Sequence, residues 1–209
     1  MLEAADPWTA AHDHLAAGTG PLAALVREHG PMRLSPRRNR FEALVASIVS
    51  QQLSTRAAST IMGRVISLVP DGFAPGAVAA LPDEVLRGAG LSRAKSIAVR
   101  AIGTQVRDGA TDLDAFDTME DAAIIGSLVA LHGVGAWTAQ MYLIFALNRP
   151  DVLATTDLGI QVAAGRALGL ATKATPIEVA TAAQAGAWHP YATVACLHLW
   201  RSLVGPAGL

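Results

Sequence analysis

Cysteine is almost absent, because the 209 residues include only Cys196. A single cysteine excludes a disulfide framework and any site that needs four cysteine ligands. A reducing cytoplasm is therefore the expected compartment. The first eleven residues contain Glu3 and Asp6 but no basic residue, so no secretory signal is predicted there. No apolar run reaches the ~18 residues expected of a membrane span, so no membrane association is expected.

An excess of charge of either sign is also lacking. Charged residues make up 16% of the chain and the formal net charge is −1. Proteins that bind nucleic acid usually carry an excess of lysine and arginine, so any phosphate contact here must rely on other groups. Hydrophobic residues make up 52%, which excludes a disordered chain. The length suits one globular unit of two closely packed lobes.

Strand alternation is missing too, and helix signals recur in its place. Residues 40–50 carry one apolar stripe, and Ser54 and Ser92 are typical N-caps. Thr118 with Asp121 resembles a capping box, and Thr175 with Glu178 is a clearer one. The expected helices include residues 40–50, 54–69, 82–88, 92–106, 118–130 and 190–203. We therefore predict an all-α fold with short turns.

The most informative segment is L-H-G-V-G-A-W-T at residues 131–138, which lies between two apolar helical stripes. Glycines at 133 and 135 permit backbone angles closed to other residues, and the amides that open the second helix can then bind an anion. A plain helix–turn–helix corner explains the glycines equally well. A dinucleotide-binding turn does not, because Thr138 occupies the third glycine position and a helical stripe precedes the turn.

With the segment P-D-V-L-A-T-T-D-L-G-I at 150–160, this hairpin resembles the helix-hairpin-helix (HhH-GPD) DNA glycosylase superfamily. Three further segments resemble its 3-methyladenine DNA glycosylase II type: residues 48–54, residues 90–95, and residues 188–191 with 199–201. The resemblance implies a single unit over 1–209 with two helical lobes and the active-site cleft between them. One lobe would span 40–148 and end in the hairpin, and the other would combine 1–39 with 149–209.

The resemblance implies that Asp157 is the catalytic carboxylate. Cleavage of an N-glycosidic bond builds positive charge on the sugar, which a carboxylate stabilises while it helps to orient or deprotonate water. Alkylated purines already carry positive charge and leave readily, so one carboxylate suffices. From the residues alone, the better explanation of Asp157 is the N-cap of a helix over 158–167, and the two roles can coexist.

Relatives that also cut the DNA strand have a lysine after the hairpin as a Schiff-base nucleophile, and Trp137 stands at that position here. Lys95 and Lys173 lie outside the motif, so the resemblance implies a monofunctional enzyme. The single cysteine also excludes the iron–sulfur cluster of the endonuclease III branch.

A glycosylase flips its target base into a pocket, and aromatic faces suit cationic bases. The expected pocket residues are Trp137, Trp188, Tyr191, Met141 and Leu158. Ordinary core packing is the alternative for the tryptophans and the tyrosine. The motif position of the DNA wedge falls on Gln52, with Leu53 beside it, unless this segment merely connects two helices.

The DNA backbone is expected to contact the hairpin and two helix starts. The candidates are Gly133, Val134, Gly135, Ala136, Thr138, Ser54, Arg93 and Lys95. A basic cluster of Arg33, Arg37, Arg38 and Arg40 either meets phosphates or forms a solvated loop. The six histidines form no zinc pattern, so no catalytic metal and no cofactor are expected. By resemblance, carbonyls of Val129, Leu131 and Val134 would bind a structural Na⁺ or K⁺.

The expected function is a monofunctional DNA glycosylase for alkylated bases of the 3-methyladenine and 7-methylguanine type, in base excision repair. Its partner would be double-stranded DNA, and the enzyme would act as a monomer on the nucleoid. Three alternatives remain open at this point: a non-catalytic DNA-binding module in which Asp157 only caps a helix, a glycosylase for oxidised guanine, uracil or ethenoadenine, and a nucleotide-binding α/β enzyme.

Overall fold

The computed structural model describes residues 6–35 and 39–204, and these residues form twelve α-helices and one 3-10 helix with no strand among them. The predicted all-α class is therefore confirmed, and the α/β alternative is wrong. The chain folds as two compact units, one of residues 36–147 and one that combines residues 1–35 with 148–209. We call these the hairpin unit and the carboxylate unit. The cleft expected between two lobes stays a prediction.

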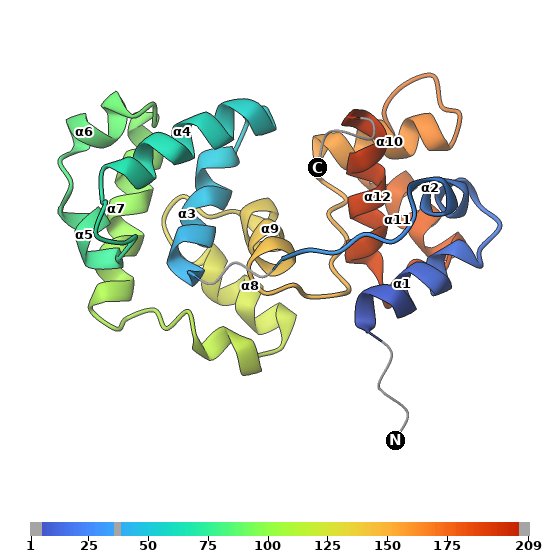
Figure 1. Cartoon of the computed structure of the whole chain (residues 1–209), viewed down its shortest axis with the longest axis horizontal. Helices are drawn as coiled ribbons and strands as arrows, with labels where there is room; N and C mark the ends of the chain where they lie inside the picture. Colours follow the sequence, from blue (N-terminus) through green and yellow to red (C-terminus); the bar gives the residue numbers. More distant parts are fainter. Residues whose placement is uncertain (1–5, 36–38, 205–209) are drawn as a thin grey trace. The chain divides into compact units, whose positions relative to one another are not determined.

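In the hairpin unit, α3 is the central helix and packs against α4, α7 and α9 (Figure 1). Its predicted apolar stripe is buried, including Phe41, Leu44 and Ile48. The helices of this unit are α3 (Arg40–Ser50), α4 (Thr55–Ser67), α5 (Pro75–Ala80), α6 (Asp83–Gly88), α7 (Arg93–Arg107), η1 (Ala115–Thr118), α8 (Asp121–Val129) and α9 (Ala136–Phe145). Burial of one stripe against three neighbours gives this unit its own core.

Most of the predicted helix starts are confirmed. The side chains of Ser54 and Ser92 accept hydrogen bonds from the backbone as the N-caps of α4 and α7. Thr175 and Glu178 form the complete capping box at the start of α11 (Pro176–Ala185). These motifs involve residues three apart, so the local sequence is enough to specify them.

The capping box predicted at Thr118 is wrong. Thr118 ends the 3-10 helix η1, and its hydroxyl donates to the carbonyl oxygen of Ala115. The next helix, α8, begins at Asp121 after Glu120, whose side chain makes no capping hydrogen bond. The threonine hydroxyl thus bonds backwards to a carbonyl of its own turn, a local alternative that competes with capping.

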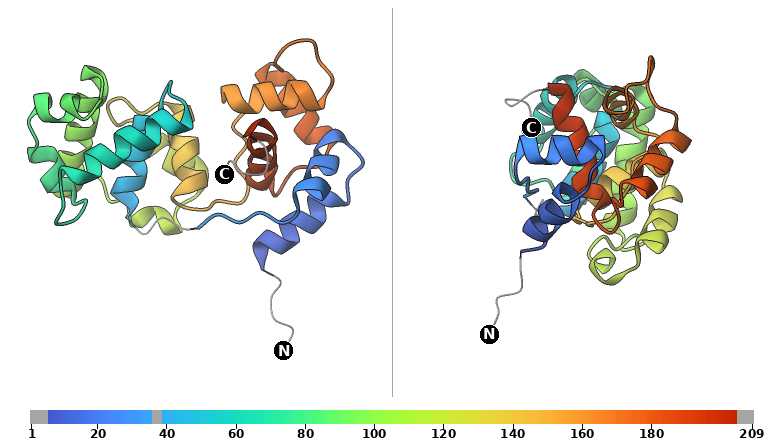
Figure 2. Two further views of the ribbon diagram at one scale, coloured as in Figure 1. Left: turned by 45° about the horizontal axis from the view of Figure 1, so that its top comes forward. Right: turned by 90° about the vertical axis from the view of Figure 1, so that its right-hand side faces the viewer.

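In the carboxylate unit, α12 (Ala192–Val204) packs against α1 (Pro7–Ala16), α2 (Pro21–His29) and α10 (Leu158–Ala167). Figure 2 shows this helix in red between the blue N-terminal helices and the orange α10. Residues 192–199 of α12 are all buried. Chain segments from both ends of the sequence therefore build one core, which a local pattern in either segment does not reveal.

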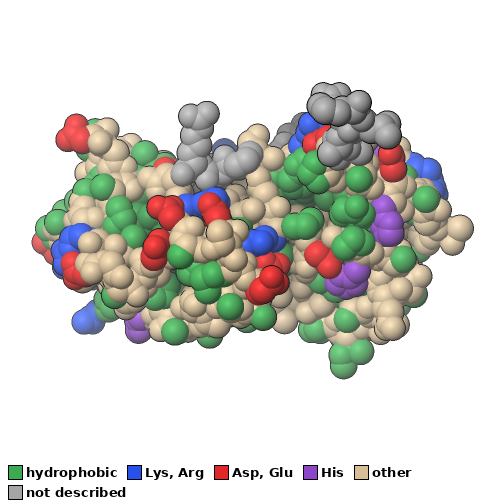
Figure 3. Space-filling model, turned by 90° about the horizontal axis from the view of Figure 1, so that it is seen from below, with side chains coloured by type: hydrophobic (Ala, Val, Ile, Leu, Met, Phe, Trp, Pro, Cys, Tyr) green, Lys and Arg blue, Asp and Glu red, His purple; other side chains and the backbone are tan. Residues whose placement is uncertain are grey.

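None of the helices in the described part of the chain has the length and apolarity that a membrane span requires. On the face drawn in Figure 3, lysine and arginine side chains lie beside aspartate and glutamate side chains and form no continuous basic stripe. This mixture agrees with the formal net charge of −1. Basic side chains alone would therefore not be enough to bind phosphate on that face, and other donors such as backbone amides would be needed.

Candidate active site and nucleic-acid interface

Asp157 is the N-cap of α10, with extended backbone angles of φ −69° and ψ 127°. Its Oδ1 accepts a hydrogen bond of 2.8 Å from the amide of Ile160. The capping role predicted from the sequence is confirmed. It also places the carboxylate at the positive end of the helix dipole, where a negative charge is stabilised.

A second donor reaches the same oxygen from a helix far along the chain. The indole Nε1 of Trp200, on α12, donates to Oδ1 of Asp157 over 2.8 Å. Two directional bonds on one oxygen fix the orientation of the carboxylate more tightly than a cap alone does. Trp200 belongs to the motif at residues 199–201, but its contact with Asp157 was not predicted from the sequence.

Gly159 makes room for that contact. A Cβ at Gly159 would lie 3.0 Å from Cδ1 and 3.1 Å from Nε1 of Trp200, and 3.1 Å from Oδ1 of Asp157. Any side chain there would press on both partners of the Asp157–Trp200 hydrogen bond. The glycine two residues after the aspartate was the only local signal of this close approach.

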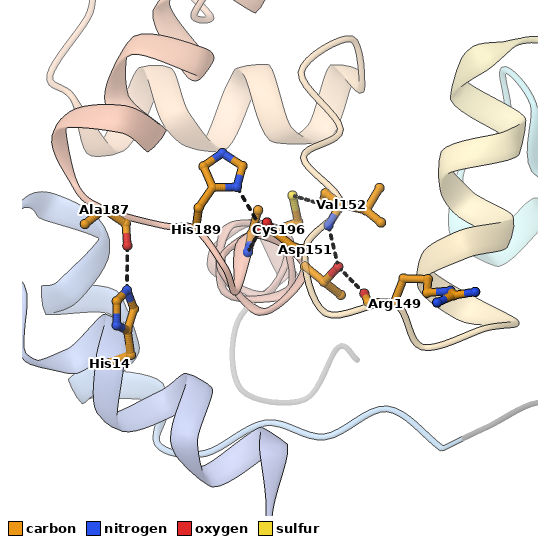
Figure 4. A network of polar contacts seen from close by, with 9 residues as sticks. His14, Arg149, Asp151, Val152, Ala187, His189 and Cys196 are labelled. Atoms are coloured by element: carbon orange, nitrogen blue, oxygen red, sulfur yellow. Dashed lines mark hydrogen bonds and ion pairs between the residues drawn. The ribbon is translucent and has the colours of Figure 1, made fainter. Parts of the chain in front are cut away.

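A network of hydrogen bonds holds the segment that leads to Asp157 (Figure 4). The hydroxyl of Thr193 donates to the carbonyl of Arg149 over 2.6 Å and accepts from the amide of Val152 over 3.1 Å. Oδ1 of Asp151 accepts from the amide of Ala192 over 3.1 Å and lies 2.7 Å from Nδ1 of His189. The start of α12 thus anchors residues 149–152, and the chain that carries the carboxylate is fixed before α10 begins.

The predicted pocket residues of the carboxylate unit differ in exposure. Leu158 follows Asp157 directly and is 61% exposed, so an apolar side chain stands beside the carboxylate on the surface. Trp188 is 4% exposed and packs against Gly186, where a Cβ would lie 2.5 Å from its Nε1. The ring of Tyr191 meets the edge of the His14 ring at 5.2 Å, and His14 bonds to the carbonyl of Ala187 (Figure 4).

The other two predicted pocket residues lie in the hairpin unit. Trp137 is half-buried in the first turn of α9, and Met141, one turn later, is 5% exposed. Met141 and Trp188 therefore belong to the cores of their units, and for Trp188 this agrees with the core-packing alternative. A pocket role for either side chain stays a prediction.

The structure explains the two glycines of the hairpin in different ways. Gly133 has φ +80°, and a Cβ there would lie 2.6 Å from Cβ of Ala98 on α7, so this position both needs the left-handed region and touches a neighbouring helix. Gly135 has φ −101° and precedes α9 as its N-cap, and a Cβ there would meet nothing within 4 Å. No side chain caps α9, so the amides of its first turn open onto accessible space at Gly135 and Ala136.

Gln51 connects the hairpin to the loop that carries the predicted wedge. Its Nε2 donates to the carbonyl of Gly133 over 3.0 Å and to Oγ1 of Thr138 over 2.9 Å. Thr138 is 2% exposed, so its hydroxyl faces this loop and only its amide stays a candidate for a DNA contact. Val134 is also buried, at 6% exposure. Gln52 and Leu53 are exposed, as a wedge requires.

Lys95 differs from its prediction as a DNA contact. Its Nζ donates to the carbonyl oxygens of Val49 over 2.8 Å and Gln51 over 2.7 Å. The ammonium is therefore turned onto the end of α3. Arg93, two residues earlier, is exposed at the start of α7, and Ser54 caps α4 at the surface. DNA contacts by Arg93 and Ser54 stay predictions.

Two arginines of the predicted basic cluster, Arg33 and Arg40, lie within the described residues. Arg33 forms an ion pair with Asp6 at 2.8 Å, and Arg40 pairs with Asp117 at 2.6 Å and also donates to the carbonyl of Ala146. These two arginines therefore have partners within the protein. Arg37 and Arg38 lie outside the described residues.

Comparisons with known proteins agree with this geometry. The family model described as the HhH-GPD superfamily of base excision DNA repair proteins matches residues 45–187. The chain belongs to the HhH-GPD superfamily. A crystal structure of DNA-3-methyladenine glycosidase from Bacillus halodurans is 36% identical, covers 92% of this chain and 88% of its own, and superposes with a TM-score of 0.76.

A second solved relative is the 3-methyladenine DNA glycosylase Mag1 of Schizosaccharomyces pombe in complex with abasic DNA. It is 27% identical over 96% of this chain and 98% of its own, with a TM-score of 0.85. By sequence, DNA-3-methyladenine glycosylase 1 of Schizosaccharomyces pombe is 30% identical over 67% of this chain. The chain spans 63% of that relative's length and 65% of the length of a Bacillus subtilis relative.

As a member of this superfamily, the chain has few candidates for a covalent nucleophile. Its two lysines are Lys95, which binds two carbonyls, and Lys173, whose Nζ donates to Oε1 of Gln161 over 2.8 Å. Cys196 is buried, its thiol donates to the carbonyl of Val152, and burial raises its pKa to about 12. A thiol held in its protonated form is a poor nucleophile, and the amines of both lysines are engaged in hydrogen bonds within the protein.

The hairpin carbonyls predicted to bind a monovalent cation lie at the end of α8 and in the turn. The carbonyl of Leu131 accepts from the amide of Val134 over 3.2 Å, and Val129 is 44% exposed. Within the described residues, no group of three or more histidine, cysteine, aspartate or glutamate side chains is arranged to hold a metal ion. The cation site on the carbonyls of Val129, Leu131 and Val134 stays a prediction.

Proposed function

We propose that the protein is a DNA glycosylase that hydrolyses the N-glycosidic bond of alkylated bases, of the 3-methyladenine and 7-methylguanine type, in base excision repair. The observation that carries the proposal is the Asp157 carboxylate, which the Ile160 amide and the Trp200 indole orient at the start of α10. Superfamily membership and relatives named as 3-methyladenine DNA glycosylases support the choice of substrate class.

The chemistry follows from the charge of the lesion. The bond between C1′ and the base nitrogen breaks with both electrons going to the base, so an N-alkylated, cationic purine leaves as a neutral molecule. The sugar is left with positive charge, which the Asp157 carboxylate stabilises. Water then attacks C1′ and loses a proton to a base, for which Asp157 is the candidate, and an abasic site remains.

The enzyme in this proposal is monofunctional. Strand cleavage through a Schiff base needs an unprotonated lysine amine near C1′. Trp137 stands where lyase relatives have that lysine, and both lysines of this chain bind oxygen atoms elsewhere. The reaction would need no cofactor, and the product would be free base plus DNA with an intact strand.

DNA would be bound as a duplex, with the uncapped first turn of α9 against a phosphate and a monovalent cation on the hairpin carbonyls. The Mag1 neighbour was solved in complex with abasic DNA, which supports DNA as the partner. We expect a monomer that acts on nucleoid DNA. Amide recognition of this kind explains how a chain of net charge −1 can bind a polyanion.

The deciding experiment measures base release from oligonucleotides that each carry one lesion. The panel contains 3-methyladenine, 7-methylguanine, 1-methyladenine, ethenoadenine and hypoxanthine, plus 8-oxoguanine and uracil. We expect release of the alkylated bases, an intact strand before alkaline treatment, and no covalent complex on borohydride addition. Release of only oxidised or deaminated bases would move the enzyme to another lesion class. DNA binding without any release would leave a non-catalytic module.

Trp200→Phe tests the second donor on Asp157. The variant keeps an aromatic ring in place but removes the N–H that bonds to Oδ1. We expect excision to slow about 10- to 100-fold, since a hydrogen bond to a charged group contributes roughly 1.5–3 kcal/mol. Single-turnover excision rates on 7-methylguanine DNA give the effect, and circular dichroism checks the fold. An unchanged rate would show that the Trp200 donor is not needed to orient the carboxylate.

A further inference from the structure

Lys95 is placed to control a loop rather than to bind a ligand. It lies in the first turn of α7, and its Nζ bonds to the carbonyls of Val49 and Gln51 at the carboxyl end of α3. The last carbonyls of a helix have no partners within the helix, and a cation there also complements the helix dipole. Burial lowers the pKa of the Lys95 ammonium, so the charge is kept here against an unfavourable environment.

The loop that follows those carbonyls is held in an uncommon conformation. Gln52 has φ +56°, a left-handed angle that is unfavourable for a residue with a side chain. Gln52 is also exposed, so its own burial does not explain the angle. Such a conformation persists where the surroundings over-determine it, and it commonly marks a functional position.

Two sets of bonds fix Gln51, the residue before it. Lys95 binds the Gln51 carbonyl, and the Gln51 side chain binds the carbonyl of Gly133 and the hydroxyl of Thr138. Gly133 in turn packs on Ala98, one turn of α7 beyond Lys95. Helix α7 thus supports both the hairpin and the loop of Gln51, Gln52 and Leu53, which we call the wedge loop.

We propose that Lys95 is a positioning residue for base flipping: its ammonium locks the wedge loop so that the Gln52 side chain is presented outward in one geometry. This rests on the proposed glycosylase function. Lys95 acts through the backbone of Gln51 and touches neither the lesion nor the reacting atoms. Through the Gln51 side chain, the same lock sets the spacing between the wedge and the phosphate-binding turn of the hairpin.

The main test compares Lys95→Met with Arg64→Met. Methionine keeps an apolar stem of similar length but removes both hydrogen bonds and the charge. Arg64 is an exposed residue of α4 in the same unit. Its variant loses one positive charge and gains a methionine, as Lys95→Met does, so it is a matched control. We expect Lys95→Met to slow single-turnover excision from duplex DNA about 10- to 100-fold, the loss typical of a misplaced group. Arg64→Met should stay within about twofold of the wild type, as surface changes usually do. Lys95→Arg, which keeps the charge and the donors, should recover part of the rate.

Two further measurements separate positioning from a general loss of structure. Gln52→Gly removes the wedge side chain and suits the left-handed angle, so Lys95→Met should add little to it in the double variant. A lesion opposite a mismatched base is easier to extrude, so it should reduce the Lys95→Met defect. The proposal would be overturned if the rate losses of Gln52→Gly and Lys95→Met multiplied in the double variant. It would also be overturned if Lys95→Met lost as much rate on mismatched as on matched DNA, or if Lys95→Met excised as fast as Arg64→Met.

A binding measurement keeps the proposal testable without chemistry. In this assay the protein is mixed with a duplex in which an abasic site lies opposite 2-aminopurine. The fluorescence of 2-aminopurine rises when a wedge residue disturbs its stacking. We expect this rise with the wild type and Arg64→Met, and a much smaller one with Lys95→Met and Gln52→Gly at saturating protein. If the wild type excises no base, the proposed function fails, while the fluorescence still decides whether Lys95 positions the wedge. An equal rise for Lys95→Met and the wild type would overturn the inference.

Discussion

Asp157→Asn should reduce base excision by at least about 10²-fold while the fold and DNA affinity stay close to those of the wild type. The amide keeps an oxygen that can accept from Ile160 and Trp200, and asparagine caps helices about as well as aspartate. What disappears is the negative charge. If the carboxylate stabilises the sugar cation, the loss falls on the transition state and leaves ground-state binding largely unchanged.

The matched control for this substitution is Asp6→Asn. Asp6 is also an N-cap aspartate of the carboxylate unit, and its side chain accepts from the amide of Thr9 at the start of α1. Single-turnover excision, fluorescence-detected DNA binding and thermal melting are measured on both variants. We expect only Asp157→Asn to lose excision. An Asp157→Asn protein that excises at the wild-type rate would remove this carboxylate from the mechanism.

Gly133→Ala should destabilise the protein by about 2–4 kcal/mol. This figure adds the cost of an alanine in the left-handed region to the cost of a steric overlap in a packed site. The overlap is the 2.6 Å that would separate the new Cβ from Cβ of Ala98. To relieve it, the hairpin must move away from α7, and the bond from Gln51 to the Gly133 carbonyl moves with it. DNA affinity should therefore fall together with stability.

Gly135→Ala is the control for the stability effect, because it adds the same methyl group two residues away from Gly133. The backbone of Gly135 suits any residue, and the added Cβ meets nothing within 4 Å, so stability should change by less than ~0.5 kcal/mol. The methyl would nevertheless stand where phosphate approaches the first turn of α9, so DNA affinity should still fall. Urea unfolding and DNA titrations measure the two effects. Equal stability of the two variants would contradict the packing argument for Gly133.

Local sequence was sufficient for features that depend on residues a few positions apart. The caps at Ser54, Ser92 and Thr175 and the capping role of Asp157 were all predictable, because each bond joins neighbours within one helical turn. The failure at Thr118 has the same origin. Its hydroxyl bonds backwards to the carbonyl of Ala115, which is a local alternative to capping the next helix.

The helices of the N-terminal stretch, α1 and α2, were not predicted. Asp6 before Pro7 is a recognisable start for α1, and Pro21 opens α2, so both helices carried local start signals. Their buried residues, such as Leu15 and Val26, are explained by packing on α12 at the other end of the chain. Which helices pack together across that sequence separation is set by tertiary packing and not by the local sequence.

By itself the sequence determined the helical class, the hairpin glycines and the carboxylate at a helix start, because these follow from backbone angles and bonds within one turn. Only the tertiary structure decided that Trp200 joins Asp157, that Gly133 rests on α7, and that Lys95 holds the wedge loop. Each of these contacts links helices that are far apart in the chain. Their distances depend on how whole helices pack, and no local pattern of residues encodes that packing.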